Sequence, residues 1–269
     1  MDILISFLET YSSVYKESRL RLASAALAYY LTMTVFPLLI CLYTMLGNSY
    51  ESVMRIIRLA SGILAPEIIS LIEEFLNYVS SNNSNSMLLA GLVLLVSYAS
   101  SAVRSIHATL YSLQGGAKFE GVRQYAASIV FSLVFLAAIY FAVVVMLSGR
   151  QFVETINIII PWLNISRTWV VLRFIVLAGI FYTLLWGIYE APKRTEDTYG
   201  TMLGAIAATI LVLAITVAFS LFIKRSANYP LVYGSLASII LLMLWLYMSC
   251  TAIYGGAALN IVLRDMRTK

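Results

Sequence analysis

The feature that most constrains this chain is a series of long apolar stretches that carry almost no charge. A helix needs about 20 mostly apolar residues to cross the roughly 30 Å hydrocarbon core of a bilayer. Backbone amides in lipid must find hydrogen bonds within their own segment, so such stretches predict membrane helices rather than loops or open sheets. Six stretches have the required length: 22–46, 87–110, 125–147, 168–189, 200–222 and 235–263.

Composition supports a membrane protein over a soluble one. Only 12% of the 269 residues are charged and 61% are hydrophobic, whereas soluble domains carry roughly 25% charged residues. An ordinary soluble surface built from this chain would lack charge to meet water. We therefore predict an all-α fold: a polytopic integral membrane helical bundle with six transmembrane helices, forming a single membrane domain over residues 1–269.

The distribution of lysine and arginine predicts the orientation. Six helices place both termini on one side of the membrane. The terminal segments and loops on that side carry ten lysines and arginines, and the segments on the other side carry six. Because positive loops favour the cytoplasm, we expect both termini there, with residues 1–21 as a cytoplasmic N-terminal segment.

Residues 50–80 predict amphipathic helices on the exterior surface. Apolar residues recur there at helical spacing, and Pro66 suits the first turn of a helix because a proline there loses no hydrogen bond. We expect one or two helices that form a lid or an interface with the outer leaflet. The apolar residues that show the spacing are Ile68, Ile72, Phe75, Leu76 and Val79.

Arg104 is the most informative charge, since it lies deep in the second predicted membrane helix. Arginine at membrane depth costs about 2.5–3.5 kcal/mol on insertion scales, so it usually faces a partner or a polar interior. One hypothesis is an anion-binding site with nearby hydroxyls; the other is an arginine that reaches out to lipid headgroups. The residues predicted to bind substrate are Arg104, Ser97, Ser100, Ser101, Thr34 and His107.

His107 is the single histidine, and it has no paired carboxylate within the predicted helices. A packing role is the simpler interpretation, with a proton relay as the alternative.

Pro37, in the middle of the first membrane helix, predicts a kink, because proline leaves the carbonyl of Met33 without its helical donor. Thr34 or a neighbouring helix could satisfy that carbonyl.

Small residues at helical spacing predict close helix packing. Gly200 and Gly204 are spaced as GxxxG, and Gly256 and Asn260 continue a similar row in the last helix. Such rows let two helices approach closely. They serve contacts within one chain or between copies, so a homo-oligomer stays open.

Enzyme signatures are lacking, and we predict that the chain is not an enzyme. The sequence contains no HExxH, GxSxG, Walker A or CxxC motif. One histidine without a carboxylate cluster does not build a hydrolytic metal site. We expect no catalytic residue, no metal and no other cofactor. Basic residues are scattered in ones and twos, so no nucleic-acid partner is expected either.

Several segments together resemble the YihY/BrkB family of bacterial inner-membrane proteins, of the UPF0761 type. The resemblance covers nearly the whole chain, and it depends on the order and spacing of motifs that are individually short. They are 25–30 with 34–38 (AALAYY, TVFPL), 97–104 (SYASSAVR), 200–205 (GTMLGA), Tyr229, 233–236 (YGSL), 244–247 (LWLY) and 256–260 (GAALN).

This resemblance implies a multi-pass protein of the bacterial plasma membrane with six helices. Many members carry glutamate where this chain has Ala258, so no proton or cation role is carried over to that position. A ribonuclease name was formerly attached to the family, and the absence of a metal site gives that name no chemical support here.

Taken together, the sequence predicts a transporter or lipid-handling protein. The bundle would enclose a polar or amphipathic cavity, lined by the first, second and sixth helices, for an anionic or amphipathic solute. The expected partners are membrane lipids, including an anionic lipid or solute at Arg104. The alternative is a non-transporting envelope scaffold that recruits partners through its exterior segments.

Overall fold

The computed structural model describes residues 2–45, 50–59, 66–82, 84–113, 128–130, 132–134, 136–138, 140–141, 165–190, 198–225 and 237–267. Within these ranges the regular secondary structure is α-helix throughout. This confirms the all-α prediction.

Among the residues that the structure describes, four helices are long and apolar enough to cross a membrane. They are α2 (Leu20–Met45), α5 (Asn85–Leu113), α8 (Thr198–Arg225) and α10 (Ala237–Arg267), and they match four of the six predicted spans. The chain is therefore an all-α membrane helical bundle.

The two other predicted spans are described only in part. Residues 168–189 lie within α7 (Ile165–Glu190), whose part with described side chains is a shorter apolar helix, Ile175–Glu190. Of 125–147, the structure describes helical residues at 128–130, 132–134, 136–138 and 140–141, here named the 128–141 segment. The rest of that span lies outside the described residues.

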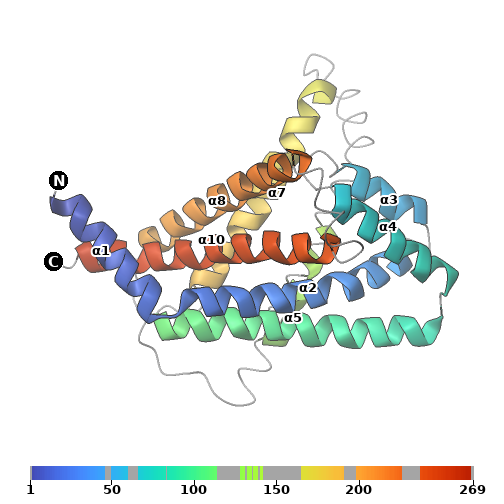
Figure 1. Cartoon of the computed structure of the whole chain (residues 1–269), viewed down its shortest axis with the longest axis horizontal. Helices are drawn as coiled ribbons and strands as arrows, with labels where there is room; N and C mark the ends of the chain where they lie inside the picture. The colour runs from blue at the N-terminus through green and yellow to red at the C-terminus, as the bar shows by residue number, and fades with distance from the viewer. Residues whose placement is uncertain are drawn as a thin grey trace.

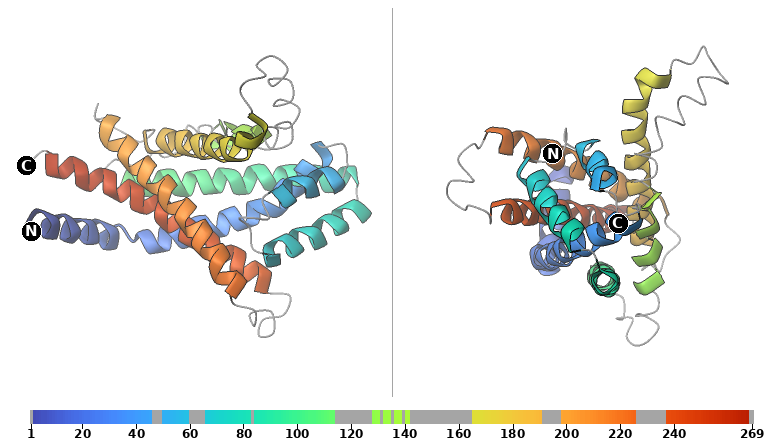
Figure 2. Two further views of the ribbon diagram at one scale, coloured as in Figure 1. Left: turned by 90° about the horizontal axis from the view of Figure 1, so that it is seen from above. Right: turned by 90° about the vertical axis from the view of Figure 1, so that its right-hand side faces the viewer.

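Both termini lie at the same end of the bundle (Figure 1). Helices α3 (Tyr50–Leu59) and α4 (Pro66–Ser81) lie at the opposite end. Helix α10 is central, since it contacts α2, α4, α5, α8 and the N-terminal helix α1 (Asp2–Glu17). Seen from above, α8 crosses α10 obliquely (Figure 2). The fold thus separates a terminal end, which carries α1, from a far end, which carries α3 and α4.

Helices α3 and α4 agree with the two predicted helices at 50–80, and α4 begins at Pro66. Their apolar faces pack on the second half of α2, around Leu39 and Tyr43. These faces are buried by packing within the protein, and the expected lid or interface with the outer leaflet stays a prediction for the rest of the two helices. The buried residues are Val53, Met54, Ile57, Leu76 and Val79.

Helix α1 is an element that the sequence did not predict. Its Tyr11 hydroxyl donates a hydrogen bond to the carbonyl of Gly255 in α10, at 3.3 Å. The turn into α2 has Arg19 in the left-handed region, with φ of 49°, which non-glycine residues adopt uncommonly. The N-terminal segment is therefore a helix docked on α10 rather than a plain extension.

Candidate functional site: an apolar cavity beside Arg104

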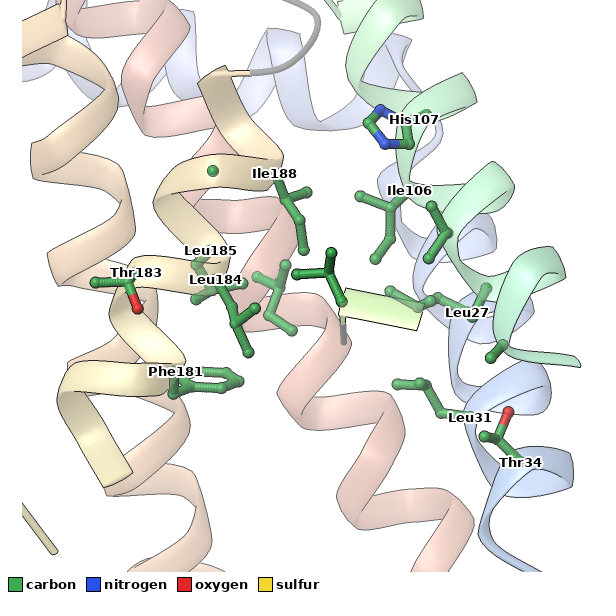
Figure 3. Close-up of a pocket in the computed structure, with 16 residues that line it drawn as sticks. Leu27, Leu31, Thr34, Ile106, His107, Phe181, Thr183, Leu184, Leu185 and Ile188 are labelled. Carbon is green, nitrogen blue, oxygen red and sulfur yellow. The ribbon is translucent and has the colours of Figure 1, made fainter. Parts of the chain in front are cut away.

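A cavity of about 250 Å³ lies between α2, α5 and α7. Figure 3 shows α7 side chains, including Phe181, Leu184 and Ile188, facing Leu27 and Leu31 of α2. Helix α10 and the 128–141 segment add one residue each. The lining residues are Leu27, Leu31, Thr34, Ala99, Ala102, Val103, Ile106, His107, Val134, Phe181, Thr183, Leu184, Leu185, Gly187, Ile188 and Ile253.

The lining is almost entirely apolar. Thr34 donates its hydroxyl to the carbonyl of Tyr30 at 2.7 Å, and Thr183 donates to Ile180 at 2.8 Å. Both hydroxyls are thus bonded to their own helices, which leaves mainly hydrocarbon toward the cavity. This cavity is therefore apolar rather than polar or amphipathic as predicted, because serine and threonine in helices bond back to nearby carbonyls.

The structure places two of the six predicted substrate residues on the cavity, Thr34 and His107. The imidazole of His107 lies at one end of the cavity in Figure 3.

Helix α2 continues through Pro37 without a break. Because Thr34 bonds to Tyr30, its hydroxyl does not serve the carbonyl of Met33, as had been suggested from the sequence.

Arg104 lies beside the cavity rather than in its lining. Its Nη2 donates to the hydroxyl of Ser101 at 2.8 Å, and its Nη1 donates to Ser128 at 3.5 Å. Ser100 and Ser132 share a further hydrogen bond at 3.2 Å. These contacts form a polar seam between α5 and the 128–141 segment. We name Arg104, Ser100, Ser101, Ser128 and Ser132 the Arg104 cluster.

Ser97 belongs to the same helix but not to this cluster. Its exposed hydroxyl donates to the carbonyl of Val93 at 2.7 Å. Ser101 likewise donates to the carbonyl of Ser97, at 2.8 Å, and its oxygen also accepts from Arg104. The predicted row of serines therefore splits into hydroxyls bonded within α5 and hydroxyls that meet the 128–141 segment.

The packing of α2 on α5 sets the position of Arg104 along the bundle. Gly91 faces Ile40, which lies 3.1 Å from where a Cβ at Gly91 would stand. The two helices run antiparallel (Figure 1), so Arg104, thirteen residues after Gly91, lies near the level of Leu27. That level is about 9 Å further along α2 than Arg21, at 1.5 Å per residue. The Arg104 cluster and the cavity therefore lie in the half of the bundle nearer the terminal end.

The small-residue rows meet where α8 crosses α10. Gly204 and Gly256 lie against each other, and the amide of Gly204 donates to Oδ1 of Asn260 at 2.7 Å. Gly200 lies in the first turn of α8.

Helix α7 is also attached to α10, because the hydroxyl of Tyr189 donates a hydrogen bond to the carbonyl of Ile253. This tie holds α7, one wall of the cavity, against α10.

Sequence reasoning missed the α7 wall of the cavity. Helix α7 supplies six lining residues from Phe181 to Ile188, but it is apolar all around, so no face of it stands out. The predicted walls were the first, second and sixth membrane helices. In the structure, α2 and α5 line the cavity as predicted, α10 contributes only Ile253, and α7 forms a wall that was not predicted.

The described residues bring together no group of three or more His, Cys, Asp or Glu side chains that could hold a metal. Cys41 and Cys250 are both buried and free. The chemistry available at this site is therefore apolar contact in the cavity, with a guanidinium and hydroxyls beside it.

Comparison with known proteins places the chain in a family. Residues 11–269 match the family model described as Virulence factor BrkB. The chain is 26% identical to the ribonuclease-like protein YfkH of Bacillus subtilis, covering 98% of this chain and 97% of that protein. It is 23% identical to a UPF0761 membrane protein of Histophilus somni, covering 97% and 91%. No solved structure matches it. Because the family model covers nearly the whole length, this membrane protein belongs to the BrkB family.

Proposed function

We propose that this protein handles or transports amphipathic lipids, with an acyl chain held in the cavity and an anionic head beside Arg104. The observation that carries the proposal is the apolar lining of a cavity inside a membrane bundle. A polar solute would gain few hydrogen bonds from such a lining and would lose those it makes with water. A hydrocarbon chain makes no hydrogen bonds with water and therefore loses none in this cavity.

The size of the cavity supports the same ligand. An apolar cavity of about 150 Å³ stays dry and binds benzene, while pockets that enclose whole drug-sized ligands span about 300–1,000 Å³. The cavity here, about 250 Å³, lies between the two. It would hold part of a lipid chain and leave the head outside.

The Arg104 cluster supports an anionic head. Guanidinium binds phosphate or carboxylate through two parallel charge-assisted hydrogen bonds, roughly twice as strong as neutral ones. The contacts of Arg104 include hydrogen bonds to the hydroxyls of Ser101 and Ser128. Thr34 and His107 would contact the chain, since both line the cavity. Ser97 would contribute least, because its hydroxyl is bonded within α5.

Membership of the BrkB family supports a membrane location, and the charge count of the sequence supports an orientation. We expect a single membrane domain of six helices in the bacterial plasma membrane, with both termini cytoplasmic. The cavity lies toward the terminal end, so its lipid would come from the cytoplasmic leaflet.

Two glycines of α7 offer a matched test. Neither Gly179 nor Gly187 has an atom within 4 Å of where a Cβ would stand, but only Gly187 lines the cavity. Gly187→Leu should fill part of the cavity, and Gly179→Leu should not. The measurement is lipid retained by the purified protein in native mass spectrometry, together with flux of a chain-labelled lipid in liposomes.

We expect Gly187→Leu to lose most retained lipid and flux while Gly179→Leu keeps both. Equal retention and flux in the two variants would remove the cavity from the proposal. That result would favour the envelope scaffold, which needs no ligand inside the bundle.

A further inference from the structure

We infer that the cavity exchanges its ligand sideways with the lipid chains of the bilayer, through a mouth between α7 and the 128–141 segment. This inference rests on the proposed function and adds the path by which a chain enters and leaves. The lining of the cavity is buried on one side and exposed on the other, and the surface beside the exposed side is apolar. Entry from water at the terminal end is the alternative that the experiment must exclude.

The inner side of the cavity is closed by packed helices. Leu27 of α2 and Ala102 of α5 line it and belong to one buried core of the bundle. Leu185 of α7 and Ile253 of α10 line it and belong to a second buried core. Protein interiors are packed as densely as organic crystals, so a chain does not pass between these residues unless the helices separate.

The outer side of the cavity is open. Thr183 and Gly187 of α7 line the cavity and are exposed, and Val134 of the 128–141 segment lines it and is 52% exposed. Thr183 and Gly187 are four residues apart, so they lie on one face of α7. Seen end-on, the 128–141 segment lies beside α7 at the outside of the bundle (Figure 2). The exposed lining residues thus mark a mouth between α7 and this segment.

The α7 side of the mouth is not obstructed by large side chains. No atom lies within 4 Å of where a Cβ at Gly187 would stand, and the Thr183 hydroxyl is turned to the carbonyl of Ile180. Helices α5 and α7, the two walls of the cavity, also pack mainly on other helices, α5 on α2 and α7 on α8. The walls therefore have little contact with each other, which leaves room for a chain to pass.

The surface beside the mouth is suited to lipid rather than to water. Ile129, Val130 and Leu133 of the 128–141 segment are exposed, and leaving one such side chain in water rather than burying it costs about 1.5–3 kcal/mol. The next charged residue of α7 after Thr183 is Glu190, about 10 Å further along the helix at 1.5 Å per residue. The mouth therefore faces the hydrocarbon of the bilayer.

The first experiment asks whether a plug in this mouth traps a bound lipid. The purified full-length Thr183→Cys variant is loaded with phosphatidylglycerol that carries a fluorescent acyl chain, and a bulky methanethiosulfonate is then attached to the new thiol. Release to phosphatidylcholine vesicles is followed before and after modification. Gly179→Cys is the matched control, because Gly179 is exposed on the same face one turn away but lies outside the lining. The unsubstituted chain controls for reaction of the buried Cys41 and Cys250.

We expect modification to slow release from Thr183→Cys by at least about tenfold, a rise of about 1.4 kcal/mol in the barrier, and to leave Gly179→Cys unchanged. Reduction of the mixed disulfide should restore the original rate. A plug differs from a side chain that fills the cavity, because filling would expel the lipid instead of retaining it. Faster or unchanged release from modified Thr183→Cys would overturn the sideways path.

The second experiment identifies the medium that the mouth meets. A bimane label on Thr183→Cys in liposomes of phosphatidylglycerol and phosphatidylcholine is exposed in turn to doxyl-labelled lipid and to iodide. Leu213→Cys, on the exposed face of α8, gives the reference for quenching from lipid, and Ser13→Cys, exposed on α1, gives the reference for quenching from water. We expect the label on Thr183→Cys to follow Leu213→Cys. A label that follows Ser13→Cys would overturn the inference.

Failure of the path and failure of the proposed function give different results. If modified Thr183→Cys releases lipid freely while Gly187→Leu still loses its retained lipid, the mouth is wrong and the lipid cavity stands. If Gly187→Leu retains as much lipid as Gly179→Leu, the proposed function fails, and the mouth has no ligand to exchange.

Discussion

Asn260 in α10 accepts a hydrogen bond from the backbone amide of Gly204 in α8, with 2.7 Å between Oδ1 and nitrogen. Its Nδ2 lies 3.4 Å from the carbonyl of Thr201 in the same partner helix. One side chain thus satisfies two backbone groups of a neighbouring helix. The approach is that close because Gly204 and Gly256 have no side chains between the two backbones. This crossing fixes α8 on α10.

Adding one methyl group at the crossing should destabilise the protein. A Cβ at Gly256 would stand 2.5 Å from the carbonyl oxygen of Gly204 and 2.8 Å from Cβ of Ala208, so Gly256→Ala forces the helices apart. Overpacking of this kind costs about 1–3 kcal/mol. The thermal midpoint in detergent should fall. The control, Gly179→Ala, adds a methyl group in open space and should leave it unchanged or higher. Equal midpoints for the two variants would contradict the close approach.

Removing the amide of Asn260 should weaken the same crossing to a smaller extent. Hydrogen bonds between membrane helices contribute about 0.6 kcal/mol on average and at most about 1.7 kcal/mol. Asn260→Ala should lower the free energy of unfolding, measured by chemical unfolding in mixed micelles, within that range. Asn82→Ala is the control, since Asn82 bonds to Tyr78 at an exposed site. A larger loss from Asn82→Ala would count against the role of Asn260.

Tyr189→Phe should loosen one wall of the cavity. The variant loses the hydrogen bond to Ile253, a net contribution of about 1 kcal/mol, but keeps the ring. Leu185 and Ile188 on α7 then lose part of their fixed position beside the cavity. We expect a lower thermal midpoint and weaker lipid retention in native mass spectrometry. Tyr182→Phe is the control, because no hydrogen bond of Tyr182 is seen among the described residues. Retention that falls equally in both variants would show that the tie to Ile253 is not what matters.

The docking of α1 should depend on pH above the range where tyrosine is neutral. Burial, with a smaller contribution from Tyr15, raises the pKa of Tyr11 above its usual value of about 10. The unfolded state therefore loses its proton first, and stability is constant below about pH 10 and falls above it. Tyr11→Phe removes this ionisation and should give a shallower decline of the thermal midpoint between about pH 9 and pH 11. Parallel curves for the two proteins would contradict the burial of the Tyr11 hydroxyl.

Some elements could be predicted from residue order alone, and others could not. The start of α4 at Pro66 follows from local chemistry. Helix α1 was missed because no continuous apolar run marks it, although Phe7, Tyr11 and Tyr15 recur four residues apart and their rings stack. That spacing was the available signal for a helix that packs on another helix.

The candidate site shows the limit more clearly. The sequence singled out Arg104 and its serines, since charge at membrane depth needs an explanation. It did not show that Thr34 and Thr183 would turn their hydroxyls to Tyr30 and Ile180. Nor did it show that Ser128 and Ser132 would meet α5, because those contacts join residues more than twenty positions apart.

By itself, the sequence determined that this chain forms membrane helices, because a backbone in lipid must bond within its own segment whatever surrounds it. It also determined which residues carry the rare charge and the small side chains. The tertiary structure alone decided that the cavity is apolar, that α7 forms one wall and that Arg104 lies beside that cavity. The physical reason is that every face of an apolar helix can pack equally well against lipid or against protein. Only the packing of all the helices decides which faces enclose a space.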